Sequence, residues 1–111
     1  VGDLPDAYIE EMIDILNNHA AKSGVPMPDQ FVGDFFGERA TLGDLLLMLL
    51  EVPEGVTELM CHPAEIDDVL RATSGYTDRR ADELAALTHP SAREVVNSEF
   101  IQLITFGDMK R

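Results

Sequence analysis

The stretch Glu58-Leu59-Met60-Cys61-His62-Pro63 follows the turn signal Pro53-Glu54-Gly55 and ends in a proline. A short apolar run between turn residues predicts a β-strand, here over 56–61. Because the apolar residues do not alternate cleanly, we expect this strand to be covered on both faces. Ligands in parallel α/β folds bind at the carboxyl ends of the strands. The strand is therefore expected to be buried and to deliver His62 into an active-site cleft.

Upstream of this strand, the pattern predicts a helix and then a short strand. Asp3 can cap the helix, Pro5 suits its first turn and Gly24 can end it. One stripe of the helix carries Tyr8, Met12, Leu16 and His19. Residues 30–36 predict a short strand after the break.

A second helix is predicted over 42–50, directly before the turn. Thr41 can cap its free amides, and Asp44 stands three residues on in a position like that of a capping box. Because residues 42–50 are apolar nearly all round, we expect this helix to be buried on several sides.

Downstream of His62, the sequence predicts a loop with a short helical turn over 64–74. Thr77 then caps a third helix, whose apolar face carries Leu84 and Leu87. His89 precedes a proline and is predicted to cap a fourth helix over 91–98.

The run 100–106 alternates Ile101, Leu103 and Thr105 against polar and apolar neighbours and predicts a last strand. The predicted order is α-β-α-β-α-α-β, in a single domain over 1–111 with mostly parallel strands and helical crossovers. Three strands leave two open sheet edges, which proteins normally cover or pair. We therefore expect either the rest of a larger sheet or barrel, or a second copy of the chain in a homo-oligomer.

Composition narrows the class of partner and compartment. The formal net charge is −13, which argues against nucleic acid or an anionic membrane as the main partner. The longest apolar run, Leu45 to Leu50, is far shorter than the ~20 residues of a membrane span. Cys61 is the single cysteine and cannot form an internal disulfide, which favours a reducing, cytoplasmic location. The first residue is Val1 rather than Met, as expected of a processed, trimmed or partial product.

His62 is the strongest candidate for chemistry. A neutral imidazole can bind metal or transfer a proton near neutral pH. Tyr76 and the pair Asp67-Asp68 lie on the connection that follows. The alternative is that His62 only satisfies loop carbonyls, that the two aspartates are caps and that Tyr76 packs. Cys61 is predicted to be a small core residue, because alternation points it away from His62.

Other motifs for chemistry are not found. There is no HxxxH, HExxH or paired CxxC from which a zinc site could be built locally. There is also no GxGxxG or GxxxxGK[ST] for nucleotide phosphates, and no GxSxG nucleophile elbow.

Three segments, in order, resemble YdjC-like carbohydrate deacetylases. Gly55-Val56-Thr57-Glu58-Leu59-Met60-Cys61-His62-Pro63-Ala64 resembles that family's G-[VT]-x-E-[LI]-x-x-H-P-[GA] segment. Tyr76-x-x-x-Arg80-x-x-Glu83-Leu84-x-x-Leu87-Thr88 resembles its Y-x-x-x-R-x-x-E-L-x-x-L-[TS] pattern. Ile101-Gln102-Leu103-Ile104-Thr105-Phe106-Gly107-Asp108 is similar to its closing strand. Residues 31–37 and Ala64 also resemble the branch linked to hopanoid biosynthesis.

The resemblance implies an α/β, partial (β/α) barrel-like fold, with this chain as the C-terminal portion of a larger deacetylase. Family members resemble hydrolases that remove N-acetyl groups from amino sugars with a divalent metal, Zn or Mg. The family's metal-ligand motifs are absent from this sequence, so the chain alone is expected to bind no metal and to be inactive. His62 carries over as the late histidine near the metal-bound water, a catalytic acid or base.

Arg80 carries over as a patterned residue that could tie its helix to the His62 loop. Tyr76, Arg80 and Asp67 are therefore predicted to bind substrate or support the loop. The alternative is a non-catalytic interaction or assembly module. Such a module would self-associate through its open sheet edges or its apolar helix.

Overall fold

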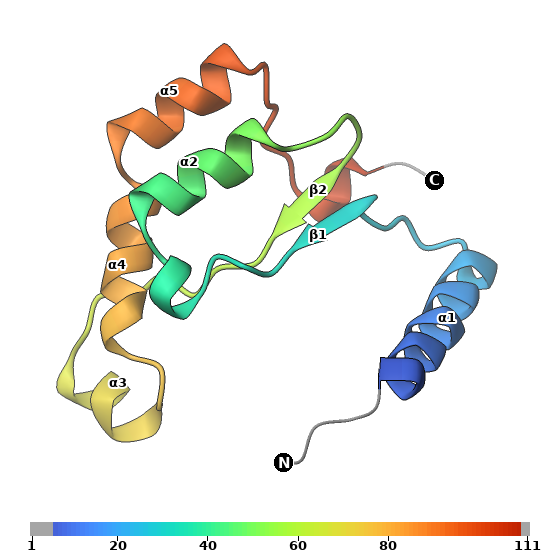
Figure 1. Cartoon of the computed structure of the whole chain (residues 1–111), viewed down its shortest axis with the longest axis horizontal. Coiled ribbons are helices and arrows are strands. Elements are labelled where there is room, and N and C mark those ends of the chain that lie inside the picture. Colours follow the sequence, from blue (N-terminus) through green and yellow to red (C-terminus); the bar gives the residue numbers. More distant parts are fainter. Residues whose placement is uncertain (1–5, 110–111) are drawn as a thin grey trace. The chain divides into compact units, whose positions relative to one another are not determined.

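The computed structural model describes residues 6–109. Along the chain the elements are α1 (Asp6–Ser23), β1 (Gln30–Val32), the 3₁₀ helix η1 (Gly37–Arg39), α2 (Leu42–Leu50), β2 (Thr57–Leu59), α3 (Asp68–Thr73), α4 (Asp78–Leu87), α5 (Pro90–Ser98) and the 3₁₀ helix η2 (Phe106–Asp108) (Figure 1). They belong to two compact units, one of Val1–Met27 with Ile104–Arg111 and one of Pro28–Leu103. The second unit contains both strands and His62.

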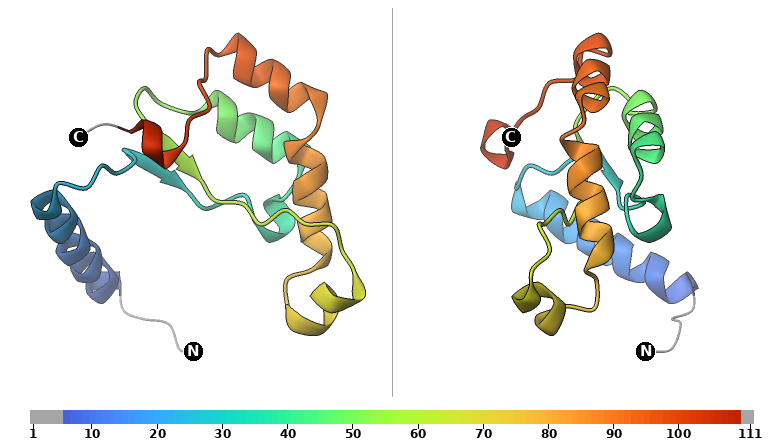
Figure 2. Two further views of the ribbon diagram at one scale, coloured as in Figure 1. Left: turned by 180° about the vertical axis from the view of Figure 1, so that it is seen from behind. Right: turned by 90° about the vertical axis from the view of Figure 1, so that its left-hand side faces the viewer.

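The sheet of the second unit is a parallel pair of short strands. Gln30, Phe31 and Val32 of β1 stand opposite Thr57, Glu58 and Leu59 of β2. The parallel direction confirms the prediction for these two strands. Both are shorter than predicted, and all three residues of β2 are only partly buried. The prediction of a strand covered on both faces is therefore wrong, because α2 and its neighbours pack on one side of the pair (Figure 2).

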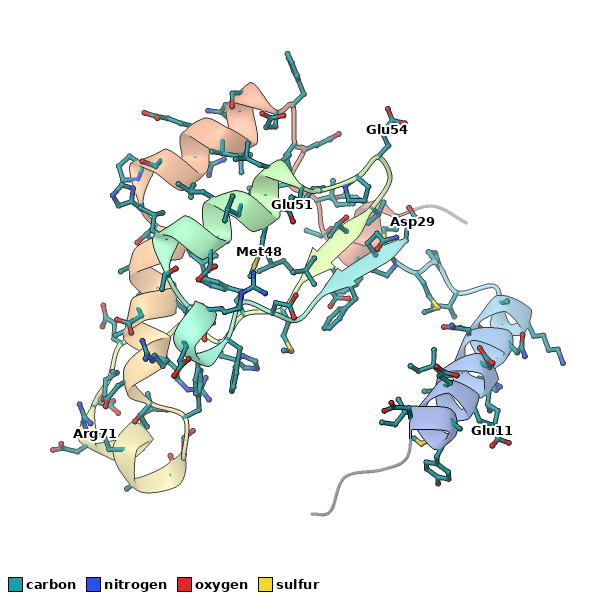
Figure 3. All side chains as sticks on the ribbon, viewed as in Figure 1. Glu11, Asp29, Met48, Glu51, Glu54 and Arg71 are labelled. Carbon is teal, nitrogen blue, oxygen red and sulfur yellow. The ribbon has the colours of Figure 1, made fainter. Side chains whose placement is uncertain are left out.

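The strand pair begins at a locked turn. The Asp29 carboxylate accepts a hydrogen bond from the Val56 amide at 2.8 Å, and the Asp29 amide donates to the Val56 carbonyl at 2.8 Å. Gly55 has a φ of +104°, a conformation that favours glycine, and a Cβ there would lie 2.6 Å from Asp29 Oδ2. In Figure 3 Asp29 lies at the start of β1, close to the turn that carries Glu54. The predicted turn over 53–55 is confirmed.

Helix α2 forms over the predicted residues with the predicted cap. The Thr41 hydroxyl accepts from the Asp44 amide at 3.1 Å. Leu45 is 2% exposed and Met48 is 7% exposed; Met48 lies on the side of α2 that faces the sheet (Figure 3). Leu47 and Leu50, by contrast, are 54% and 50% exposed. The helix is thus buried on one side and not on several, since only one side has neighbours in this unit.

The core of this unit lies between α2, α4, α5 and the strand pair. Helix α2 packs against both α4 and α5, and α2 and α5 run side by side in both figures (Figures 1 and 2). The buried cluster consists of Phe35, Leu45, Met48, Ala86 and Ala92, with Val32, Leu42, Leu46, Leu49, Leu59 and Leu87 packed against it. Burying a leucine or phenylalanine side chain contributes roughly 1.5–3 kcal/mol, so this cluster holds the unit together.

The helices after His62 start close to where the sequence predicts. Helix α3 occupies part of the predicted turn over 64–74. Thr77 precedes α4, but its side chain makes no capping hydrogen bond, which corrects the predicted cap. His89 caps α5 as predicted, since its Nδ1 accepts from the Ser91 amide at 3.1 Å.

The predicted last strand over 100–106 does not form among the described residues. Phe100 has a φ of +56° and is 94% exposed, and the Ile101 amide donates to the Val96 carbonyl as α5 ends. Residues 101–105 are irregular and lead into η2. A strand needs a neighbouring strand to satisfy its backbone groups, and alternation alone does not supply one. The observed order is therefore α-β-α-β-α-α-α.

The first unit contains α1, which ends before Gly24 as predicted. Gly24 has a φ of +72°, the left-handed conformation typical of a residue just past a helix. The predicted contributions of Asp3 and Pro5 lie outside the described residues. None of the residues of α1 is buried. No described helix combines the length and the apolar character needed to cross a membrane.

Candidate functional site

The carboxyl ends of the two strands bring Phe36 and His62 together. Phe36 follows β1 and His62 follows β2, and parallel strands end at the same edge of a sheet. The ring centroids of Phe36 and His62 are 6.1 Å apart, with the planes at 77°. His62 therefore lies in the loop after β2, three residues past Leu59, the last residue of the strand.

Helix α4 holds the backbone of His62 on both sides. The His62 amide donates to Glu83 Oε1 at 2.6 Å, and the His62 carbonyl accepts from Arg80 Nη1 at 3.4 Å. Beyond Pro63, the Ala64 amide donates to the Arg80 carbonyl at 3.2 Å. The backbone of this loop thus forms hydrogen bonds with α4 and not with another strand. Arg80 contributes two of these bonds and so connects the helix to the loop.

Glu83 is the one fully buried polar side chain among the described residues, at 0% exposure. Its second oxygen, Oε2, accepts from the Tyr76 hydroxyl at 2.5 Å. The same hydroxyl oxygen accepts from the Gly37 amide at 3.0 Å. A buried carboxylate is costly unless its oxygens are bonded, and both oxygens are satisfied here. Glu83 therefore links α4 to the ends of both strands.

Three aromatic rings pack together at Tyr76, the residue whose hydroxyl donates to this carboxylate. Phe36 stacks on Tyr76 with centroids 4.3 Å apart and planes at 17°. His62 meets the Tyr76 ring edge to face, at 6.1 Å and 79°. Offset stacking and edge-to-face packing are the favourable arrangements of aromatic pairs. The imidazole is thus packed against two rings that approach from β1 and from the start of α4.

Tyr76 is fixed by its backbone as well as by its hydroxyl. Arg80 Nε donates to the Tyr76 carbonyl at 2.6 Å, and the guanidinium carbon lies 5.4 Å from the centre of the Tyr76 ring. The Tyr76 amide donates to the Ser74 hydroxyl oxygen at 3.2 Å. A guanidinium over an aromatic face adds an electrostatic attraction. Tyr76 and Arg80 therefore form one support beneath the His62 loop.

Two neighbouring groups have raised pKa values. Desolvation raises the pKa of Tyr76, the hydrogen bond to Glu83 raises it further, and the Gly37 amide acts in the opposite direction. Tyr76 is therefore a protonated donor at neutral pH. Desolvation also raises the pKa of Cys61, and the charge of Glu83 adds to the rise. The Cys61 side chain is nevertheless exposed, so its predicted place in the core is wrong: β2 ends at Leu59, before the alternation reaches Cys61.

The imidazole itself keeps one ring nitrogen unused. His62 Nδ1 is buried and has no hydrogen-bond partner among the described residues. The alternative that His62 only satisfies loop carbonyls receives no support from this nitrogen. Nδ1 is a buried polar atom, and no hydrogen bond within the described residues offsets the free-energy cost of its desolvation.

Asp67 is placed differently from the other predicted site residues. Its Oδ1 accepts from the Leu70 amide at 2.8 Å and caps α3. This agrees with the alternative interpretation of the sequence, in which Asp67 is a capping residue. The described residues show no hydrogen bond between Asp67 and His62, Tyr76 or Arg80. The structure thus brings together three of the four predicted residues.

The metal implied by the resemblance finds no donor set in the described part of the chain. No three His, Cys, Asp or Glu side chains there converge to hold an ion. Both oxygens of Glu83 already accept hydrogen bonds. The described residues therefore do not fit such an ion by themselves.

A pocket of about 410 Å³ lies elsewhere, and His62 does not line it. Its walls come from α2, α4 and the residues beside them: Ala40, Thr41, Leu42, Arg79, Asp82, Ala85, Ala86 and His89. The predicted active-site cleft around His62 is thus not this pocket.

Glu83 and Phe36 were not predicted as site residues. A signal for Glu83 exists in the sequence, because it shares the predicted apolar face of α4 with Leu84 and Leu87, where a charge is unexpected. Phe36 has no comparable signal, since its contact with Tyr76 joins segments forty residues apart. Only the fold brings these two rings together.

Comparison with known proteins agrees with the motifs. The family described as "YdjC-like protein" matches residues 3–98. A carbohydrate deacetylase of Geobacillus stearothermophilus is 37% identical over 85 residues, which are 76% of this chain and 35% of that protein. One of Thermoanaerobacter pseudethanolicus is 32% identical over 89 residues, 80% of this chain and 36% of that protein. The chain thus spans about a third of the length of these relatives.

A solved structure shares the fold. A protein of Enterococcus faecalis V583, described as a cellobiose-phosphate cleavage protein, superposes with a TM-score of 0.70 and 24% identity. The match covers 86% of this chain and 46% of that one. The fold is therefore mixed α/β with a parallel strand pair, and it corresponds to part of a larger protein's fold. By its match over residues 3–98, the chain belongs to the YdjC-like carbohydrate deacetylase family.

Proposed function

We propose that this chain supplies the His62 part of a carbohydrate N-deacetylase, in which His62 transfers a proton during hydrolysis of an N-acetyl group on an amino sugar. The observation that carries this proposal is the place of His62. Its backbone is bonded to α4 on both sides and its ring is packed at the carboxyl end of β2. An end of a parallel strand is where such folds bind ligands.

The reaction moves the protons of the attacking water to the departing nitrogen. The water oxygen attacks the acetyl carbonyl carbon, the carbon–nitrogen bond breaks, and acetate and the protonated amine leave. The amine departs easily only if its nitrogen gains a proton, and an imidazole titrates in the range where it can donate one. His62 would be that donor, or would take the proton from the attacking water. The family's divalent metal would polarise the carbonyl, but its ligands are not among the described residues.

The complete activity would reside in a longer protein. The chain spans about 35% of its deacetylase relatives, and its sheet has two strands with one unpaired edge each among the described residues. We infer that residues 1–111 form the C-terminal portion of a larger barrel-like domain and that this chain alone is inactive. The closer assignment to the hopanoid-associated branch stays a prediction.

The test is deacetylation of N-acetylated chito-oligosaccharides or related amino-sugar lipids by a family-length protein that contains these residues. We expect His62→Ala to lower kcat by roughly 10²- to 10⁴-fold, the usual contribution of a general acid or base. His89→Ala is the matched control, because His89 caps α5 away from this site. Wild-type activity in His62→Ala would show that the assigned role is wrong.

A second candidate is a non-catalytic assembly module, and the exposed apolar side chains of the strand pair favour it. Phe31 of β1 is 60% exposed beside an edge that has no partner among the described residues. Activity of the family-length protein would support the first reading, whereas an inactive family-length protein together with self-association of the isolated chain would support the second.

A further inference from the structure

Glu83 connects three segments that are distant in sequence. Its Oε1 accepts from the amide of His62, twenty-one residues away, and its Oε2 accepts from the Tyr76 hydroxyl. The Tyr76 hydroxyl also accepts from Gly37, next to the stacked ring of Phe36. One carboxylate therefore accepts hydrogen bonds both from the backbone of His62 and from the side chain of Tyr76, whose ring packs against His62.

Stability alone does not require a carboxylate at this position. Glu83 is 0% exposed, and no Lys or Arg of the described residues forms an ion pair with it. Burying a charge carries a desolvation cost that its hydrogen bonds offset, and apolar replacements of buried charged groups are often neutral or stabilising. Unlike an apolar side chain, a carboxylate can accept hydrogen bonds from two donors at once.

The imidazole of His62 depends on this arrangement for its orientation. Its Nδ1 is buried without a partner among the described residues, so no hydrogen bond at that atom fixes the ring. What fixes the ring is packing, with Tyr76 and Phe36 each at 6.1 Å and nearly perpendicular to it. If Tyr76 loses its hydrogen bond to Glu83, the ring against which the imidazole packs loses one of the contacts that hold it in place.

We propose that Glu83 is a positioning residue for His62, acting on its backbone directly and on its ring through Tyr76. This inference rests on the proposed function and deepens it. It assigns no contact with substrate to Glu83. The buried carboxylate determines the position of the imidazole during proton transfer.

The test is the NMR spectrum of the isotopically labelled 111-residue chain with Glu83→Gln. Glutamine keeps the size of the side chain but has an NH2 group in place of one carboxylate oxygen, so either the His62 amide or the Tyr76 hydroxyl meets a donor where it now has an acceptor. We expect the backbone amide signal of His62 and its ring proton signals to move. Asp82→Asn is the matched control, because it removes the same charge from an exposed neighbour on α4 and should leave these signals in place.

Tyr76→Phe serves as the second variant in case Glu83→Gln does not fold. It keeps the ring and removes only the hydroxyl, so the ring signals of His62 should move while its amide remains bonded to Glu83. A folded variant of either kind whose His62 signals stay at their wild-type positions would overturn the proposal. Unfolding of both variants would also overturn it, because the pair would then be a folding element rather than a positioning device.

Kinetics separate this proposal from the proposed function. In a family-length protein, Glu83→Gln should lower kcat by on the order of 10²-fold with KM nearly unchanged, as expected for a displaced catalytic group. If His62→Ala is fully active while Glu83→Gln still moves the His62 signals, the positioning stands and the proposed function is wrong. If His62→Ala is inactive while Glu83→Gln changes neither kcat nor the signals, the positioning is wrong and the function stands.

Discussion

At the scale of single residues, the carboxylate of Glu83 affects the pKa values of two neighbouring side chains. The carboxylate is buried, and it raises the pKa of both Tyr76 and Cys61, in each case after the larger effect of desolvation. The raised pKa keeps the Tyr76 hydroxyl protonated, so that it donates to Glu83 throughout the neutral range. The hydrogen bond and the protonation state therefore support each other.

This coupling predicts that the chain loses stability in alkali. Below about pH 10 the phenol of Tyr76 is protonated in both the folded and the unfolded state. As the pH rises further, the unfolded state releases its proton first, because the folded pKa is the higher one. The free energy of unfolding should therefore fall until the pH exceeds the folded pKa.

The measurement is urea unfolding from about pH 8 to about pH 11. Tyr76→Phe should be less stable at neutral pH, by about 1–3 kcal/mol for the unsatisfied acceptor, and should show a shallower alkaline decline. Tyr8→Phe removes a hydroxyl outside this network and is the matched control. An equal decline in wild type and Tyr76→Phe would contradict the assignment.

At the scale of elements, α2 shows that a local cap marks where the helix begins, whereas tertiary contacts determine which of its side chains are buried. The helix forms over the residues that the Thr41 cap and the following leucines predict. Which leucines become core depends on the neighbours, since Leu45 is 2% exposed and Leu47 is 54% exposed. Helix α2 also spans the connection between β1 and β2, so its packing places both strand ends that form the site.

A matched pair of substitutions in α2 tests this division. Leu45→Ala should lower the free energy of unfolding by about 2–5 kcal/mol, because it removes buried methyl groups and leaves a cavity. Leu47→Ala changes the same side chain in the same helix but should cost less than about 1 kcal/mol. Thermal and urea unfolding of both variants give the comparison. Equal losses would show that the two leucines are buried alike.

At the scale of the whole molecule, the chain has more exposed apolar groups than its small core can cover. Each strand of the pair has one neighbour among the described residues, which leaves one edge of each strand unpaired. Phe31 on β1 is 60% exposed, and Leu103 and Phe106, both within the predicted last strand over 100–106, are 65% and 66% exposed. Unpaired edges with apolar side chains are sites where another strand can add.

We therefore expect the isolated 111-residue chain to self-associate. The sedimentation coefficient should rise with protein concentration, and Phe31→Lys should reduce this rise more than Gln30→Lys does, because it removes the exposed aromatic ring as well as adding a charge to the edge strand. Gln30→Lys adds the same charge on the same strand without removing the aromatic ring, and it is the control. A monomer at every concentration would contradict the expectation.

The sequence by itself determined the features that depend on neighbouring residues. These are the cap of α2, the turn at Gly55 and the His89 cap of α5. Each rests on a hydrogen bond or a backbone conformation within a few residues, so the pattern contains all the partners. The resemblance to the family was likewise readable from the motifs, and the match over residues 3–98 confirms the family.

Only the tertiary structure decided the features whose partners are distant in sequence. The bond from His62 to Glu83 joins residues 21 apart, and the bond from Gly37 to Tyr76 joins residues 39 apart. The predicted strand over 100–106 did not form and Cys61 is exposed, because alternation states which side chains could face a core but not whether a neighbour is there. His62 could thus be identified from its strand and its motif. Its orientation is a property of the packed rings and the buried carboxylate, which no local pattern encodes.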